Sequence, residues 1–235
     1  MSGQIIIING TSGSGKSTTC ELFSRQSTDF WMLHGVDHFM GSNFPRQFGH
    51  HGERCEEGIS AHPLDESEPE GALRWRFGLW GHRGFAAFHE SVAAVARQGC
   101  NIIIDHLMIT DPPILQDCIW RLQDLPVLLV TLKPPYTVLM ERVASREIGT
   151  RFASSQFDEE RIRKSRERLE RLRPWLYQAV YANPICDLEI DSDALGPDSV
   201  CQQIEHRLKA GPGTAFDQLR QIYPGGVDGF SGFVG

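Results

Sequence analysis

Four consecutive isoleucines, Ile5–Ile8, lead through Asn9 into the sequence Gly-Thr-Ser-Gly-Ser-Gly-Lys-Ser. A short β-branched run of this kind is typical of a strand that is buried on both faces of a parallel sheet. The following residues fit G-x-x-x-x-G-K-[ST] at every fixed position, and this motif requires a strand before it and a helix after it. The chain therefore begins with a predicted strand, a glycine-rich loop at residues 10–17 and a helix over about residues 15–25.

This loop has the chemistry expected for binding nucleotide phosphates. Its glycines let backbone N–H groups turn toward a phosphate, and the N-terminus of the following helix adds partial positive charge. We expect Lys16 to reach the β- and γ-phosphate oxygens and the Ser17 hydroxyl to bind Mg²⁺. The alternative, a chance glycine–serine turn, does not account for the strand and the helix on either side. The residues expected to bind the nucleotide are Gly10, Thr11, Ser12, Gly13, Ser14, Gly15, Lys16, Ser17 and Thr18.

Short apolar runs alternate with longer amphipathic segments along most of the chain, which is typical of α/β proteins. Strands are expected at Ile5–Ile8, Trp31–Gly35, Asn101–Asp105, Val127–Leu132 and Leu188–Ile190, and helices at 15–25, 78–97, 112–122, 136–146 and 197–208. Residues 41–71 are rich in Gly, Pro and charge, and are expected to be irregular. The sequence thus predicts a P-loop NTPase or kinase fold, with a mostly parallel sheet flanked by helices on both faces.

Composition and charge exclude several classes of protein. The 235 residues include 23 Lys and Arg against 30 Asp and Glu, a net charge of −7, whereas a general nucleic-acid-binding protein needs a basic surface. The six cysteines include no C-x-x-C pair, which disfavours a zinc site of that kind and fits a reduced chain. No apolar run approaches the ~20 residues needed to cross a bilayer. We therefore expect a cytoplasmic protein that binds neither nucleic acid nor membrane.

A phosphate-binding loop does not by itself identify a reaction, so the acidic residues at other strand ends matter. The chain lacks the Asn/Thr-Lys-x-Asp sequence with which GTPases read the base. Asp37 follows the strand predicted at Trp31–Gly35, at the edge of the sheet where ligands bind, and a carboxylate there can accept the proton of an attacking hydroxyl. Asp105 ends another predicted strand, where it can help to bind Mg²⁺ or contact the acceptor. The alternative for both is an ordinary turn or helix-capping carboxylate.

Three arginines are candidates for a lid over the transferred phosphoryl group. Arg142 and Arg146 lie one helical turn apart, and Arg151 follows shortly after them. Small kinases close an arginine-bearing lid over phosphoryl oxygens, which carry negative charge. The alternative for the basic region that continues to Arg173 is a solvated helix with ion pairs at i, i+4.

Together these segments resemble the chloramphenicol phosphotransferase-like kinases. The resemblance rests on the loop at 10–17, on Gly35-Val36-Asp37 and on Asn101-Ile-Ile-Ile-Asp105, with weaker similarity at 57–60 and 71–74. It covers about residues 4–150 and implies an ATP-dependent kinase that phosphorylates a hydroxyl group of a small molecule, with Asp37 as the base. The chain departs from the family pattern at His106, where a second aspartate is usual, and in residues 153–183, which look like an insertion.

The expected organisation is a P-loop kinase domain over residues 1–210 and a glycine-rich C-terminal tail over residues 211–235. Within the domain, we expect residues 41–75 to form an insert on the acceptor side and residues 142–175 to form the lid region. The tail is expected to be a mobile end whose aromatic residues dock loosely.

The predicted activity is transfer of the γ-phosphate of ATP, with Mg²⁺, to a hydroxyl of a chloramphenicol-like antibiotic or a metabolite. A nucleoside or nucleotide kinase of the same architecture is an alternative enzyme. A non-catalytic nucleotide-binding regulatory module is an alternative of another class. The sequence indicates no oligomeric state.

Overall fold

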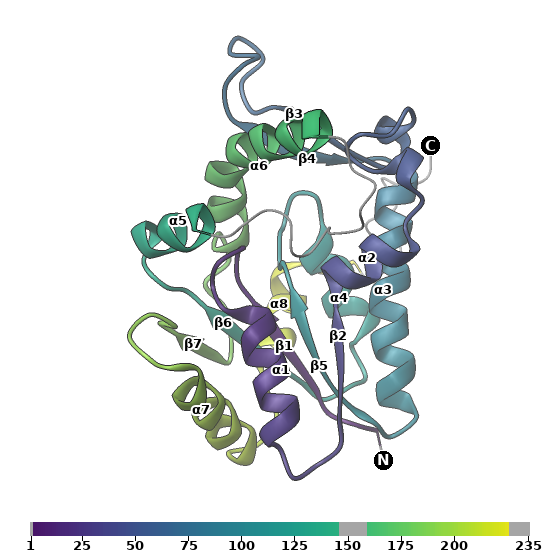
Figure 1. Cartoon of the computed structure of the whole chain (residues 1–235). Coiled ribbons are helices and arrows are strands. Elements are labelled where there is room, and N and C mark those ends of the chain that lie inside the picture. The colour runs from purple at the N-terminus through teal and green to yellow at the C-terminus, as the bar shows by residue number, and fades with distance from the viewer. Residues whose placement is uncertain (1, 146–158, 226–235) are drawn as a thin grey trace.

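A five-stranded parallel sheet forms the centre of the protein, with the strand order β2-β5-β1-β6-β7 (Figure 1). The computed structural model describes residues 2–145 and 159–225. The strands are β1 (Ile5–Asn9), β2 (Trp31–Gly35), β5 (Asn101–His106), β6 (Val127–Leu132) and β7 (Leu188–Ile190). Because all five run in the same direction, the loops that follow them meet at one edge of the sheet. This arrangement confirms the predicted fold and all five predicted strands.

The four isoleucines of β1 are fully buried and alternate between the two faces of the sheet. Ile5 and Ile7 belong to a core with α3 (Leu79–Arg97), α4 (Ile114–Arg121) and α8 (Ala215–Ile222). Ile6 and Ile8 belong to a second core with α1 (Lys16–Gln26) and α7 (Pro197–Lys209). A strand covered on both sides needs an unbroken apolar run, which explains why the isoleucines are consecutive.

A smaller layer lies beyond the carboxyl edge of the sheet (Figure 1). It consists of the antiparallel hairpin β3 (Ile59–Pro63) and β4 (Leu73–Phe77) and the long helix α6 (Glu159–Val180), which contacts β4. The prediction that residues 41–71 are irregular is therefore wrong at β3. The helices α2 (Val36–Asn43) and α5 (Tyr136–Ala144) and short 3₁₀ turns at 46–48 and 55–57 complete the elements.

The region predicted to be a loosely docked tail contains α8. Phe216 and Leu219 of this helix are 4% and 0% exposed and belong to the core that covers α4. Two apolar side chains at i, i+3 give the helix one buried face, so residues 215–222 are part of the packed domain. The division at residue 210 stays a prediction, and residues 226–235 lie outside the described residues.

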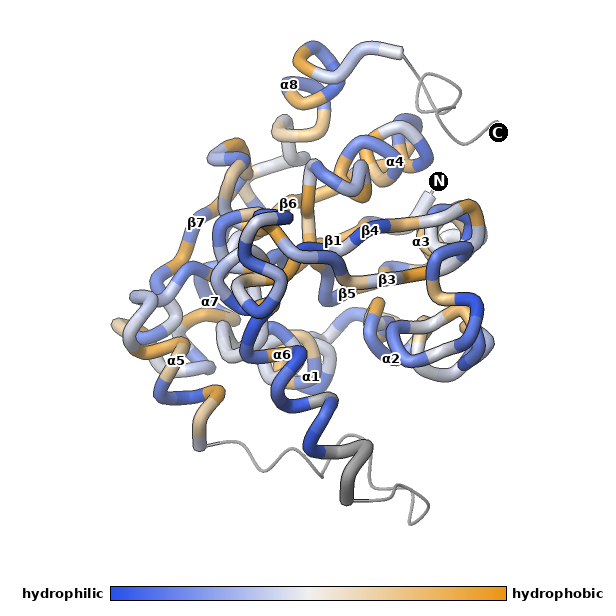
Figure 2. Tube along the Cα trace, turned by 90° about the horizontal axis from the view of Figure 1, so that it is seen from above, coloured by the Kyte–Doolittle hydropathy of each residue, from blue (hydrophilic) through white to orange (hydrophobic). Residues whose placement is uncertain are grey.

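The polar character of α6 distinguishes it from the core helices. Seen from above, the coloured part of its N-terminal half is mostly hydrophilic (Figure 2), whereas Val180 at its C-terminal end is buried in the core that contains Ile5 and Ile7. Within residues 2–145 and 159–225, no helix has an apolar stretch of the length that a membrane span requires.

Candidate active site

The glycine-rich loop connects β1 to α1 in a conformation that its glycines allow. Gly13 and Gly15 have φ angles of +90° and +95°, which residues with a Cβ rarely adopt. Gly15 precedes the first residue of α1, and no side chain caps this helix N-terminus. The first N–H groups of α1 therefore have no intrahelical acceptor and are directed toward the loop, as in anion sites at helix N-termini.

Lys16 and Ser17 begin α1 and direct their polar groups into the same region. The Lys16 ammonium donates a hydrogen bond to the carbonyl oxygen of Thr11 at 2.9 Å, so its side chain curls over the loop. The Ser17 hydroxyl donates to Oδ2 of Asp105 at 2.7 Å. The two residues expected to bind Mg²⁺ are thus in direct contact, although 88 positions separate them in the sequence.

Gly35 explains how the Asp105 carboxylate fits beside the loop. The two residues are partners in the parallel pairing of β2 with β5. A Cβ atom at Gly35 would lie 2.6 Å from Oδ1 of Asp105, closer than van der Waals contact. Glycine at this position therefore leaves the space that the 9% exposed Asp105 carboxylate occupies.

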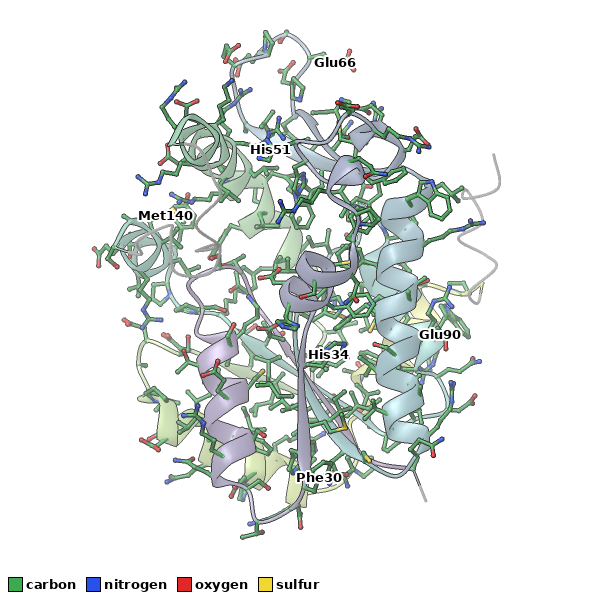
Figure 3. All side chains as sticks on the ribbon, turned by 45° about the vertical axis from the view of Figure 1, so that its right-hand side comes forward. Phe30, His34, His51, Glu66, Glu90 and Met140 are labelled. Atoms are coloured by element: carbon green, nitrogen blue, oxygen red, sulfur yellow. The ribbon has the colours of Figure 1, made fainter. Side chains whose placement is uncertain are left out.

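Asp37 lies two residues beyond Gly35, in the first turn of α2. The sequence placed Asp37 at the end of the strand predicted at Trp31–Gly35, and the structure shows that a helix begins at Val36 immediately after β2. Asp37 is exposed at the carboxyl edge of the sheet, beyond β2, whose residue His34 is labelled in Figure 3. An exposed carboxylate at this edge can reach a ligand, and its role as a base stays a prediction.

Of the three predicted lid arginines, only Arg142 lies in the described part of the chain. It is on α5, which ends at Ala144 rather than at the predicted residue 146. Its guanidinium group donates to the carboxylate of Asp193 at 2.8 Å and lies 3.5 Å from the carbonyl oxygen of Gly13. Arg142 therefore borders the glycine-rich loop, while Arg146 and Arg151 lie outside the described residues.

Residues that the sequence did not single out hold the loop from distant parts of the chain. The hydroxyl of Tyr181 accepts from the Thr11 N–H at 3.3 Å and donates to the Leu132 carbonyl at 2.8 Å. The hydroxyl of Ser192 donates to the carbonyl oxygen of Ser14 at 2.7 Å. The two contacts with the loop itself join residues 170 and 178 positions apart, so no local pattern could have indicated them.

A buried network of hydrogen bonds continues from the strand that carries Asp105. Nδ1 of His106 accepts from the Leu107 N–H at 2.7 Å, so a neutral ring carries its proton on Nε2. That Nε2 atom is 2.8 Å from Nε2 of His89, whose Nδ1 is 2.5 Å from Oδ2 of Asp117. Burial holds the pKa of His106 well below its usual value, so this ring is neutral and donates to His89, which donates to Asp117.

The same histidines and Cys118 bring three possible metal ligands within 4.8 Å of one another. Two imidazole nitrogens on one tetrahedral zinc ion lie about 3.3 Å apart, since each Zn–N bond is about 2.0–2.1 Å. The observed separation of 2.8 Å is shorter, and the His106 nitrogen that would bind a metal carries the proton. The geometry therefore fits a hydrogen-bonded network and not a metal site.

At the glycine-rich loop, by contrast, the available groups fit a magnesium nucleotide. Uncapped N–H groups and the Lys16 ammonium are donors for phosphate oxygens. The hydroxyl of Ser17 and the carboxylate of Asp105 are the hard oxygen ligands that Mg²⁺ prefers. The residues could thus hold ATP and its metal ion at one end of the sheet.

Comparison with known proteins identifies the family. The sequence matches the model of the chloramphenicol phosphotransferase-like proteins over residues 3–209, and no curated protein matches it. The APS kinase CysC of Mycobacterium tuberculosis, solved in complex with AMPPNP and APS, has a TM-score of 0.53 at 12% identity, over 88% of this chain and 98% of that chain. The protein APE1195 has a TM-score of 0.52 at 12% identity, over 89% and 96%. These two likenesses show the fold, and the family match shows that the chain belongs to the chloramphenicol phosphotransferase-like family.

Proposed function

We propose that this protein is an ATP- and Mg²⁺-dependent kinase that transfers the γ-phosphate to a hydroxyl group of a small molecule, a chloramphenicol-like antibiotic or a metabolite. The observation that carries the proposal is the contact between Ser17 of the loop and Asp105, next to Gly35 and the start of α2. This arrangement combines a phosphate site, a metal site and an exposed carboxylate at one edge of the sheet. Family membership supports the same reaction class.

Each group has a distinct role in this proposal. The loop N–H groups and Lys16 bind the β- and γ-phosphates and hold them in a fixed orientation. Ser17 and Asp105 hold Mg²⁺, which neutralises charge on the transferred group. Asp37 accepts the proton of the acceptor hydroxyl as its oxygen attacks the γ-phosphorus.

Arg142 is placed beside the loop, where its charge can stabilise the phosphoryl oxygens in the transition state. An ion pair with Asp193, with 2.8 Å between the guanidinium nitrogen and the carboxylate oxygen, holds the Arg142 side chain beside the loop. We propose that Arg146 and Arg151 belong to the same lid region, which extends over residues 142–175. Residues 41–75, which include β3 and most of β4, form the acceptor side.

The experiment that tests this function is product identification. The protein is incubated with Mg²⁺ and γ-labelled ATP against a panel of hydroxylated antibiotics, sugars, hydroxy acids and nucleosides, with the Lys16→Ala variant as control. A phosphate ester formed on a hydroxylated acceptor by the wild type alone supports the proposal. Products found only on nucleosides or nucleotides favour the alternative kinase, and nucleotide binding without any labelled acceptor contradicts enzymatic transfer to a small molecule.

A further inference from the structure

A cavity of about 230 Å³ lies between β4 and the loop that follows β5. The strand contributes four consecutive residues to its wall, and the loop contributes Asp111, Pro112 and Pro113. This loop follows Asp105 at the carboxyl edge of the sheet, so the cavity is on the same side of the molecule as the glycine-rich loop. We refer to it as the β4 cavity; its lining residues are Arg74, Trp75, Arg76, Phe77, His82, Asp111, Pro112 and Pro113.

Half of the residues that line the β4 cavity come from β4 itself. Successive side chains of a strand point to opposite faces, yet residues 74–77 all line the cavity. In the described sheet, β4 pairs only with β3. Residues from both faces of β4 therefore contribute to the wall of the cavity.

Two buried N–H donors of β4 have no acceptor among the residues that the structure describes. Nε of Arg74 and Nε1 of Trp75 are both buried and make no hydrogen bond there. Buried polar groups in folded proteins are nearly always paired. Arg74 shares a strand face with Arg76, and both line the cavity, so the unpaired donor of Arg74 points to a ligand that accepts hydrogen bonds.

The charges around the cavity specify the kind of acceptor. Arg74 and Arg76 leave β4 on the same face, and within residues 2–145 and 159–225 neither forms an ion pair with another residue. Burial lowers the pKa of His82 to about 4, so this imidazole is neutral at pH 7. Asp111 is exposed and is the one carboxylate in the wall, which leaves an excess of positive charge. Guanidinium groups bind carboxylates and phosphates through paired hydrogen bonds.

We propose that the β4 cavity binds a carboxylate or phosphate group of the acceptor, with Arg74 as the residue that determines specificity. This inference rests on the proposed function and narrows its substrate class to hydroxyl compounds that also carry an anionic group. The volume fits a substituent better than a whole molecule, because pockets for drug-sized ligands measure about 300–1,000 Å³. Trp75 and Phe77 supply an apolar wall for the carbon atoms next to that group.

Anion binding tests the cavity without any assay of phosphoryl transfer. The protein is first saturated with Mg²⁺ and a non-hydrolysable ATP analogue, so that the glycine-rich loop is filled, and is then titrated with inorganic phosphate and separately with acetate in a calorimeter. We expect one anion per chain, with binding weakened at least tenfold by Arg74→Gln and by less than threefold by Arg74→Lys. The matched control is Arg83→Gln, an exposed arginine of α3 that lies over the Trp80 ring, and it should bind like the wild type.

Absence of saturable binding, or equal binding by wild type and Arg74→Gln, would overturn the proposal. The two anions show which group of the acceptor the cavity binds. Tighter binding of acetate indicates a carboxylate, and tighter binding of phosphate indicates a phosphate ester. For an acceptor that the wild type phosphorylates, the acid is then compared with its neutral methyl ester or dephosphorylated analogue. A preference for the anionic form of at least tenfold in kcat/KM, lost in Arg74→Gln, supports the cavity as an acceptor site. Equal kcat/KM for the anionic and neutral forms would contradict the cavity as an acceptor site without contradicting the proposed kinase activity.

Discussion

The glycine-rich loop and the β3–β4 hairpin both lie toward the carboxyl edge of the sheet (Figure 1). Different kinds of contact hold them there. The loop connects one strand directly to one helix, and the backbone of these adjacent elements defines its shape. The hairpin depends on α6, about 100 residues later in the chain. Arg171 donates to the carbonyl oxygens of Gly71 and Pro69, and the rings of Trp75 and Trp175 lie 5.9 Å apart.

A second contact of the same kind links α6 to the turn before β3. Arg168 donates to the carbonyl oxygen of His50 and lies 3.4 Å from the ring of His51, which is labelled in Figure 3. The backbone shape of the loop thus follows from two adjacent elements, with distant residues such as Tyr181 and Ser192 adding single hydrogen bonds, whereas the hairpin is held in place mainly by contacts with α6. Substitutions near the loop should therefore affect nucleotide chemistry directly, while substitutions in α6 should affect the hairpin at a distance.

Among the variants that compare the loop with the hairpin, the largest effect is expected for Lys16→Ala, which removes the ammonium group from the nucleotide side. Loss of one positioned donor to transition-state charge lowers kcat by about 10²–10³-fold or more. The fold should stay intact, because Lys16 is not part of either core. Single-turnover transfer from labelled ATP measures the effect, with circular dichroism as the folding control. Near-normal turnover by a folded variant would contradict the assignment of the loop.

Gly35→Ala tests whether Mg²⁺ binding requires the Asp105 carboxylate at its observed position beside Ser17. The added methyl group would lie 2.6 Å from Oδ1 of Asp105 and should displace the carboxylate from Ser17. Displaced ligand geometry weakens metal binding by about 10-fold, so the Mg²⁺ concentration for half-maximal activity should rise by that factor. Gly41→Ala in α2, which has no neighbour within 4 Å of its Cβ position, is the control. An equal Mg²⁺ requirement in both variants would show that Asp105 does not act at the metal.

Arg171→Ala tests the dependence of the acceptor side on α6. Two charge-assisted hydrogen bonds to the hairpin are lost, which should lower the free energy of unfolding by about 1–2 kcal/mol. KM for the acceptor should rise while affinity for ATP stays the same. Arg166→Ala, an exposed arginine of the same helix, is the matched control in urea unfolding. A change in ATP affinity instead of acceptor KM would contradict the separation of the two sides.

The smallest expected effect is the contribution of His50 to the pH dependence of stability. The His50 ring stacks on the Trp75 ring, with 5.7 Å between the ring centroids. Burial, followed by the charges of Arg168 and His51, lowers the pKa of His50 to about 4. Between about pH 6.5 and pH 4 the unfolded chain takes up a proton that the folded chain does not, so stability falls as the pH falls. His50 should account for about 1 kcal/mol of the loss between pH 6.5 and pH 5.5. Urea unfolding of wild type and His50→Phe should show the smaller pH dependence in the variant, and equal slopes would contradict the low pKa.

Features that adjacent residues determine could be predicted from the sequence, whereas features that depend on contacts between distant residues could not. The parallel strands and the loop were predictable, because continuous β-branched runs and fixed glycine spacing are local signals. The contact of Ser17 with Asp105 followed from the expectation that strand ends meet at one edge. The alternation of apolar residues and arginines at Leu73–Phe77 is the pattern of a half-buried strand. Its partner β3 lies in a segment whose glycines, prolines and charges favour irregular structure, so the hairpin was not predicted. Gly35 matters because it faces Asp105 on the neighbouring strand. Tyr181 and Ser192 reach the loop only in the folded chain. None of the three residues therefore has a local sequence signature.

Asp37→Asn most directly tests the proposal that Asp37 acts on the acceptor and not on the nucleotide. Asparagine keeps the size of the side chain and removes its basicity, so kcat should fall by about 10²–10⁴-fold. Calorimetric affinity for Mg²⁺ and a non-hydrolysable ATP analogue should change by less than threefold. Weakened nucleotide binding with normal turnover of the bound fraction would contradict the account, and would assign Asp37 to the metal and leave Asp105 as the candidate base.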